Sequence, residues 1–209
     1  MKKSITLFLL LVCFAPIQAA DSPETADAER IMERIGRAAG DVQTISSNFS
    51  QEKHLAMLKN VTITRGVFYF AKPDRLRWEL THPDRSGFAV DGEKGIKWKG
   101  KEENRRTFQL GSDPAIHHFV NQVFAWVRAD RKWLKENYRI SVRSEDPAAL
   151  SLFPATEEEK NVLSRVEILF SSDDRYVQQV EIHEKDGDFT RIRFLNTIIN
   201  SPFKPELFQ

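Results

Sequence analysis

Short hydrophobic runs separated by turn residues fill the stretch from Gly66 to Trp98. The clearest run alternates strictly, with charged residues between Leu76, Trp78 and Leu80. A period of two puts apolar side chains on one face of a β-strand and charged side chains on the other. Proline, glycine and aspartate between the runs are typical of turns. The pattern therefore predicts an antiparallel meander with one face toward water and the other toward a hydrophobic core or cavity.

Strand patterns continue on both sides of this meander, and the total is about ten or eleven strands. Residues 67–70 are apolar at every position, so both faces of the sheet are expected to be covered there. We predict a loop at the acidic residues 157–159 and a two-residue hairpin turn at Asp186-Gly187. The further strands are expected at residues 45–54, 61–71, 138–143, 150–152, 162–171, 176–183 and 189–199.

Helical spacing of apolar residues replaces this alternation in two places. A first helix is expected to begin at Pro23 and end at Gly40. Asp113-Pro114 begins a second helix of about four turns, and Asp130 caps a shorter third one. The fold class is therefore mainly β (α+β), as one domain at residues 21–209, with the inserted helices packed on the sheet. The apolar stripe of the second helix comprises Ile116, Phe119, Val120, Val123, Phe124 and Val127.

Residues 1–20 have the features of a secretory signal peptide: two lysines, an apolar run and small residues at the end. We expect cleavage after Ala19 or Ala20. The only cysteine, Cys13, lies within the apolar run, where modification as a lipoprotein is an alternative that Val12 disfavours. Cleavage would remove two lysines and no acid, changing the formal net charge from +1 to −1. Such a chain has no basic field for nucleic acid.

Sequence motifs for catalysis are absent. The chain has no G-x-S-x-G elbow, no H-E-x-x-H and no phosphate-binding glycine loop. None of its five histidines stands at a metal-ligand spacing, and the adjacent His117 and His118 would diverge by roughly 100° on a helix. We therefore expect a protein that is not an enzyme and needs no metal or cofactor.

Aromatic residues are abundant, with 15 Phe and 4 Trp spread over the predicted strands and the second helix. Two interpretations remain open on this pattern alone. The aromatics either fill an ordinary core, or they line a cavity for acyl chains, as in barrels that enclose ligands. Each methylene group moved from water into such a cavity contributes about 0.8 kcal/mol, so a few acyl chains would bind without a charged anchor.

A set of short motifs resembles, in order and spacing, the signature of LolA-like periplasmic outer-membrane lipoprotein carriers. The resemblance is clearest over residues 45–98, and beyond residue 110 it rests on the insertion of helices between two sets of strands. The motifs are Phe49-Ser50-Gln51, residues 66–70, Lys72-Pro73, Arg77-Trp78, Pro83, Asp91-Gly92 and Trp98.

This resemblance implies an unclosed antiparallel β-barrel whose helices form a lid over a hydrophobic cavity. It further implies a monomeric periplasmic carrier that takes the acyl chains of lipoproteins from an inner-membrane transporter and passes them to an outer-membrane receptor. The lipid-binding residues implied are Phe68, Phe70, Leu76, Trp78, Leu80 and Trp98 in the wall, and Ile116, Phe119, Val120, Val123 and Phe124 in the lid.

One position departs from the family pattern. The carriers typically have an arginine before the motif proline that hydrogen-bonds to the lid, and here Lys72 occupies that position as the expected lid latch. Lysine lacks the planar five-donor fork of arginine. The departure favours, as alternatives, a carrier of another lipid or glycolipid in a dedicated envelope pathway, or a lipid-sensing regulator with the same fold.

Overall fold

The computed structural model describes residues 23–57, 60–100 and 104–209. The predicted signal peptide lies outside these residues. The strands are β1 (Thr44–His54), β2 (Val61–Ala71), β3 (Arg75–His82), β4 (Ser86–Asp91), β5 (Lys94–Lys99), β6 (Arg106–Gln109), β7 (Tyr138–Glu145), β8 (Ala148–Pro154), β9 (Leu163–Phe170), β10 (Val177–Glu184) and β11 (Phe189–Ile199). The α-helices are α1 (Pro23–Gly40), α2 (Pro114–Arg128), α3 (Arg131–Asn137) and α4 (Glu157–Lys160), with 3₁₀ turns η2 (Leu110–Ser112) and η3 (Pro205–Phe208).

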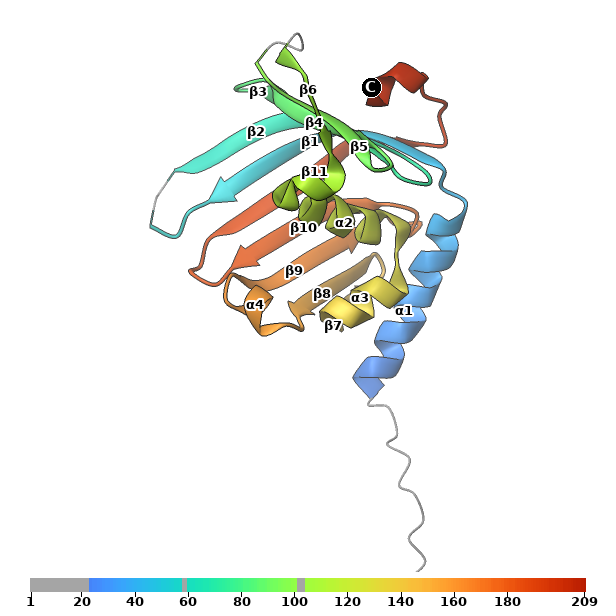
Figure 1. Ribbon diagram of the computed structural model, residues 1–209. Helices are drawn as coiled ribbons and strands as arrows, with labels where there is room; N and C mark the ends of the chain where they lie inside the picture. The colour runs from blue at the N-terminus through green and yellow to red at the C-terminus, as the bar shows by residue number, and fades with distance from the viewer. Residues whose placement is uncertain (1–22, 58–59, 101–103) are drawn as a thin grey trace, which may run out of the picture.

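All eleven strands of the described residues form one antiparallel sheet, in the order β6-β5-β4-β3-β2-β1-β11-β10-β9-β8-β7. The outer strands β6 and β7 do not pair with each other, so the strongly curved sheet stays unclosed (Figure 1). The first and last long strands, β1 and β11, pair at its centre. The predicted fold, a mainly β unclosed barrel with an N-terminal helix and inserted helices, is confirmed.

The inserted helices begin where the sequence predicts. The side chain of Asp113 accepts a hydrogen bond from the backbone N–H of Ile116 (3.2 Å), and Asp130 accepts one from Trp133 (3.0 Å). Each carboxylate thereby satisfies a backbone donor that the first helical turn leaves unpaired. Helix α2 lies across one face of the sheet, which we call the inner face, and α1 runs along the end near β7 (Figure 1).

The hydrophobic core lies between the inner face and the helices. Within this core the ring of Phe49 on β1 approaches the backbone of β2 closely, because it lies directly over Gly66. A Cβ atom at Gly66 would lie 2.1 Å from the carbonyl oxygen of Glu79 and 2.4 Å from the Phe49 ring. The largest fully buried side chains are Phe49, Phe70, Ile31, Ile35, Leu76, Leu150, Leu152, Val42, Val90, Val120, Val166 and Val180.

The outer face of β3 corrects the expectation that its charged residues face water. Arg77 and Glu79 are only 5% and 4% exposed. The guanidinium of Arg77 donates to Glu79 (2.6 Å) and to the carbonyl of Leu207 in η3 (3.1 Å). Arg85 donates to the second oxygen of the same carboxylate (2.8 Å). The C-terminal segment therefore covers this part of the outer face, where Phe203 also packs on Tyr69.

Two further local expectations are wrong. Residues 157–160 form the short helix α4, not a loop, and Thr156 caps it by accepting from the backbone N–H of Glu159. The turn after β10 is longer than two residues, because the backbone N–H of Glu184 bonds to the carbonyl of Asp188 (2.8 Å). Gly187 supplies the positive φ (94°) that this longer turn requires.

Replacing Glu79 by Leu is expected to lower the free energy of unfolding by about 3–5 kcal/mol, since the buried Arg77 would lose its carboxylate. The double variant Arg77→Met/Glu79→Leu is expected to lose less than the single variant, since it removes both charges. Urea unfolding measures both. A double variant whose loss equals the sum of the losses of Glu79→Leu and Arg77→Met, measured separately in the same way, would contradict this account of the pair.

Gly66→Ala is expected to lower the free energy of unfolding by about 1–3 kcal/mol, because the added methyl group collides with backbone and with Phe49. Gly40→Ala is the control, since a Cβ there has nothing within 4 Å. Urea unfolding of the two variants is the measurement. Equal stability of both proteins would mean that the sheet relaxes around the new methyl group at no cost.

Candidate functional site

The apolar stripe of α2 closes the inner face. Phe119, Val123, Trp126 and Val127 face the sheet, and the space left between helix and strands is about 20 Å³. That volume has room for about one water molecule. Its lining is entirely hydrophobic: Trp78, Phe119, Val123, Trp126, Val127, Val177, Val180, Ile182, Ile192 and Phe194. We call this space the closed pocket.

A second, larger space opens beside the closed pocket. This cleft, of about 930 Å³, lies between strands β3 to β6 and the first turn of α2. Trp78 borders both spaces, and the ring of Phe119 stands edge-on to Trp78 (5.2 Å) and to Phe88 (5.9 Å) between them. The described residues that line the cleft are Trp78, Leu80, Ser86, Gly87, Phe88, Lys97, Trp98, Lys99, Asn104, Arg105, Arg106 and Ile116.

Most of the residues proposed for the lipid site lie on the inner face of the sheet or on the side of α2 that packs against it. Phe68, Phe70 and Leu76 are buried in the core, where Phe70 meets Phe124 of α2 at 5.9 Å between ring centres. Trp78 and Leu80 line the cleft. On α2, Ile116 lines the cleft, Phe119 stands between the two spaces, Val123 lines the closed pocket and Val120 is fully buried.

Trp98 lies on the opposite face of the sheet from Trp78. Its backbone is paired with Gly87, whereas Trp78 is paired with the next residue, Phe88, so the two indoles project from opposite faces. The guanidinium of Arg77 stacks over the Trp98 ring at 4.5 Å. Trp98 therefore borders the cleft only at its rim. Its main contact is with Arg77 of the buried Arg77–Glu79 pair on the outer face.

Lys72 is not placed as a latch on the lid. Its ammonium group donates to the carbonyls of Gly40 (2.8 Å) and Ala39 (3.4 Å), and so caps the C-terminus of α1. The hydrogen bond between α2 and the turn at Pro73 comes instead from a side chain of α2. The guanidinium of Arg128, in the last turn of α2, donates to the carbonyl of Pro73 and stacks on Phe124 at 4.2 Å.

Arg128 is therefore a site residue that the sequence reasoning missed. Burial lowers the pKa of its guanidinium, and the nearby charges of Asp74 and Asp130 oppose that shift. The sequence did place this basic residue in the last turn of the predicted helix. The partial negative charge of a helix C-terminus favours a cation there. What the sequence did not indicate was which loop it would reach.

Two more polar contacts hold α2. At its N-terminus, Lys97 of β5 donates to Asp113 (2.7 Å), and this hydrogen bond, with that from Ile116, lowers the pKa of the Asp113 carboxyl. In the middle, Gln122 donates to the hydroxyl of Tyr138 on β7 (3.2 Å). Burial and the charge of Glu159 raise the pKa of Tyr138 to about 12, so the phenol stays neutral and accepts this bond.

The closed pocket also uses residues from the second half of the sheet that were not predicted as site residues. Phe194 on β11 contacts Trp78 (6.2 Å) and Phe68 (5.4 Å), and Phe49 contacts Trp78 at 4.2 Å. These strands carry ordinary alternating patterns, so no local signal set them apart. Only the pairing of β1 with β11 brings them opposite α2.

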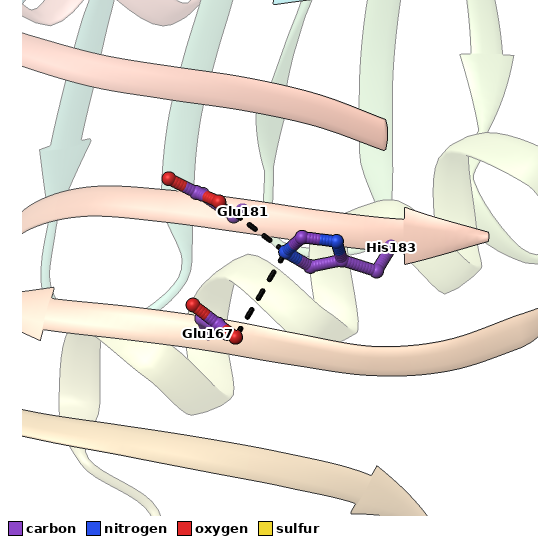
Figure 2. Close-up of side chains that lie close together, drawn as sticks. All are labelled: Glu167, Glu181 and His183. Carbon is purple, nitrogen blue, oxygen red and sulfur yellow. Dashed lines mark ion pairs between the residues drawn. The ribbon is translucent and has the colours of Figure 1, made fainter. Parts of the chain in front are cut away.

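A cluster of His183, Glu181 and Glu167 occurs on the outer face (Figure 2). Nε2 of His183 lies 3.2 Å from Glu181 and 4.0 Å from Glu167. Both carboxylates also accept from arginines: Glu167 from Arg165 (2.7 Å) and Arg143, and Glu181 from Arg191 (2.6 Å). Three guanidinium groups oppose a cation here, so the geometry fits an ion-pair ladder across the strands better than a metal site.

Burial disfavours ionisation of Glu181, but the hydrogen bond and charge of Arg191 outweigh it, so the pKa of its carboxyl lies below the usual value. The outer face of these strands is therefore charged and paired, whereas the inner face is apolar. Among the described helices, none is long and apolar enough to span a bilayer.

Solved structures with this fold come from several bacteria. An uncharacterized conserved protein from Thermus thermophilus superposes with a TM-score of 0.55 at 8% identity, covering 88% of this chain and 93% of that one. A chain of the MucA/MucB complex of Pseudomonas aeruginosa gives a TM-score of 0.52 at 12% identity. That match covers 88% of this chain but only 60% of the other. These likenesses show the fold.

Sequence comparison is more specific. A curated outer-membrane lipoprotein carrier protein of Shewanella loihica is 29% identical over 82 residues, which span 39% of this chain and 38% of that carrier. The model of the LolA family, outer membrane lipoprotein carrier protein, matches residues 40–209. This chain therefore belongs to the LolA family of outer membrane lipoprotein carriers.

Proposed function

We propose that this protein carries the acyl chains of lipoproteins across the periplasm, held between α2 and the inner face of the sheet. One observation carries the proposal: an amphipathic helix covers a pocket without a single polar lining residue among those described. Such a pocket suits hydrocarbon, since each methylene removed from water contributes about 0.8 kcal/mol. The family and the match to a curated carrier support this assignment.

Loading requires α2 to move. The closed pocket holds about 20 Å³, which is too little for a hydrocarbon chain, so an acyl chain could enter only after α2 has moved. An acyl chain would replace the stripe of α2 on the sheet, and the helix would swing away as a lid. The ligand shifts the balance between closed and open forms only by its preference for the open one.

No bond needs to be made or broken in this cycle. Transfer from an inner-membrane transporter to an outer-membrane receptor would follow differences in affinity among the three proteins. The route fits a chain exported by a signal peptide at residues 1–20, cleaved after Ala19 or Ala20, and working as a monomer in the periplasm. In this proposal the protein is a binding protein and not an enzyme.

The MucA/MucB likeness favours a second candidate, a regulator that binds a partner protein through the same fold. Native mass spectrometry of the mature protein, purified from the periplasm of the producing cell, separates the two. A co-purifying acylated polypeptide supports the carrier. A stoichiometric partner without acyl chains supports the regulator, and a free phospholipid or glycolipid supports a carrier for another lipid.

Val123→Glu is expected to weaken binding of a fluorescent fatty acid at least about a hundredfold, because the chain held between α2 and the sheet would then lie against a charged carboxylate. Val162→Glu is the matched control, since Val162 is 66% exposed. Fluorescence titration measures the affinities, and circular dichroism checks that both variants keep the sheet. Equal affinity of the two folded variants would remove α2 from the binding site.

Arg128→Gln is expected to speed amide hydrogen exchange in α2 about tenfold, because it removes the charged donor to the Pro73 carbonyl. Arg139→Gln is the control: Arg139 stacks on Phe153 at 4.3 Å, nearly the geometry of Arg128 on Phe124, but on the face of β7 opposite to Tyr138, the residue that α2 contacts. Hydrogen exchange with mass spectrometry reports on both. Unchanged exchange in α2 would mean that Arg128 does not hold the lid.

A further inference from the structure

One cross-strand row of the inner face changes from aromatic to basic as it approaches the β6 edge. The pairing places Phe68 beside Trp78, Trp78 beside Phe88, Phe88 beside Lys97 and Lys97 beside Arg106. Residues paired directly across neighbouring strands project from the same face. Trp78 in the aromatic part of the row borders the closed pocket, whereas Phe88 and the basic end of the row line the open cleft.

A third cation, Lys99, lies in the neighbouring row. It is paired with Ser86, which is paired in turn with Leu80, so its side chain shares the inner face. Among the described residues, four that line the cleft are basic and none is acidic. Lys97 pairs with Asp113, whereas Lys99 and Arg106 have no ion pair with any described residue. The cleft thus combines an apolar floor with a basic rim, in which Lys99 and Arg106 have no carboxylate partner among the described residues.

We propose that the cleft binds the anionic headgroup of a lipid, a phosphate or a carboxylate, whose hydrocarbon chain follows the aromatic row past Phe119 into the closed pocket. This inference rests on the proposed binding of acyl chains between α2 and the sheet. It favours a free anionic lipid as the cargo over a lipoprotein, whose diacylglyceryl group has no anionic headgroup. Strands lie about 4.8 Å apart, so the three steps from Trp78 to Arg106 span roughly 14 Å. Headgroup and chain therefore occupy different parts of one continuous surface.

The two parts of this surface would do different work. The chain supplies most of the affinity through burial. The exposed cations add little each, but several acting together select an anionic headgroup over a neutral one and orient the ligand. Lys97 gives the headgroup a further role, since an anion that competes for its ammonium group weakens its pair with Asp113, the residue that caps α2.

The test compares two ligands with the same chain, lauric acid as the anionic probe and its neutral glycerol monoester, by isothermal titration calorimetry at low salt. The parent protein is expected to bind laurate about tenfold more tightly than the monoester, and salt is expected to reduce this preference. In Lys99→Gln/Arg106→Gln, laurate affinity is expected to fall to that of the monoester, while monoester affinity stays unchanged.

Lys132→Gln/Arg37→Gln is the charge-matched control, since both side chains are exposed helix residues outside the cleft, at 86% and 72%. It should retain the preference for laurate. Equal affinity of the parent for the two ligands would overturn the headgroup inference and leave the acyl-chain carrier standing. Failure of the parent to bind either ligand would overturn both. A preference that persists in the Lys99/Arg106 variant would place the anion elsewhere.

Discussion

The structure depends on the burial of one helical stripe against one open sheet. An unclosed barrel leaves a concave apolar face that water would otherwise cover, and α2 fills it with Phe119, Val123 and Trp126. The contact is made of hydrocarbon and aromatic rings only, so it is strong in total but has no directional element that a ligand must imitate. A hydrocarbon chain is therefore a chemically equivalent replacement for the helix.

The polar contacts around the lid have a different task. Arg128, Gln122 and Asp113 each tie α2 to a different part of the sheet, and none of them reaches the closed pocket. They fix the position of α2 on the sheet, but they do not change which ligands the closed pocket would bind best. On the outer face, Arg77 and Glu79 pair within β3 and Arg77 ties that strand to η3, whereas the ion pair of Glu181 with Arg191 joins β10 to β11.

The sequence predicted most of the fold and some of the residues that line the closed pocket and the cleft, and the reasons differ from place to place. Alternation located β3 and caps located α2, because both are local signals. The burial of Arg77 could not be inferred, since the segment that covers it lies 130 residues away. The face of Trp98 depends on its register with Gly87, and the partner of Lys72 depends on where α1 ends. Phe194 needed the pairing of β1 with β11.

The two ends of α2 are held by contacts of unequal strength. In the proposed opening motion, α2 would therefore rotate about the end that is held more firmly. At the C-terminal end, half-buried Arg128 holds the turn at Pro73, and the chain continues directly into α3. At the N-terminal end the ion pair joins Asp113 to Lys97, whose side chain is about half exposed, so solvent screens the pair and it stabilises the seated helix little. A helix of 15 residues is about 22 Å long, so a rotation of roughly 20° about the Arg128 end would carry the Asp113 end about 8 Å outward. In the proposed opening motion, α2 would therefore move most beside the basic cleft and least at Arg128. An acyl chain would enter only from the Asp113 end.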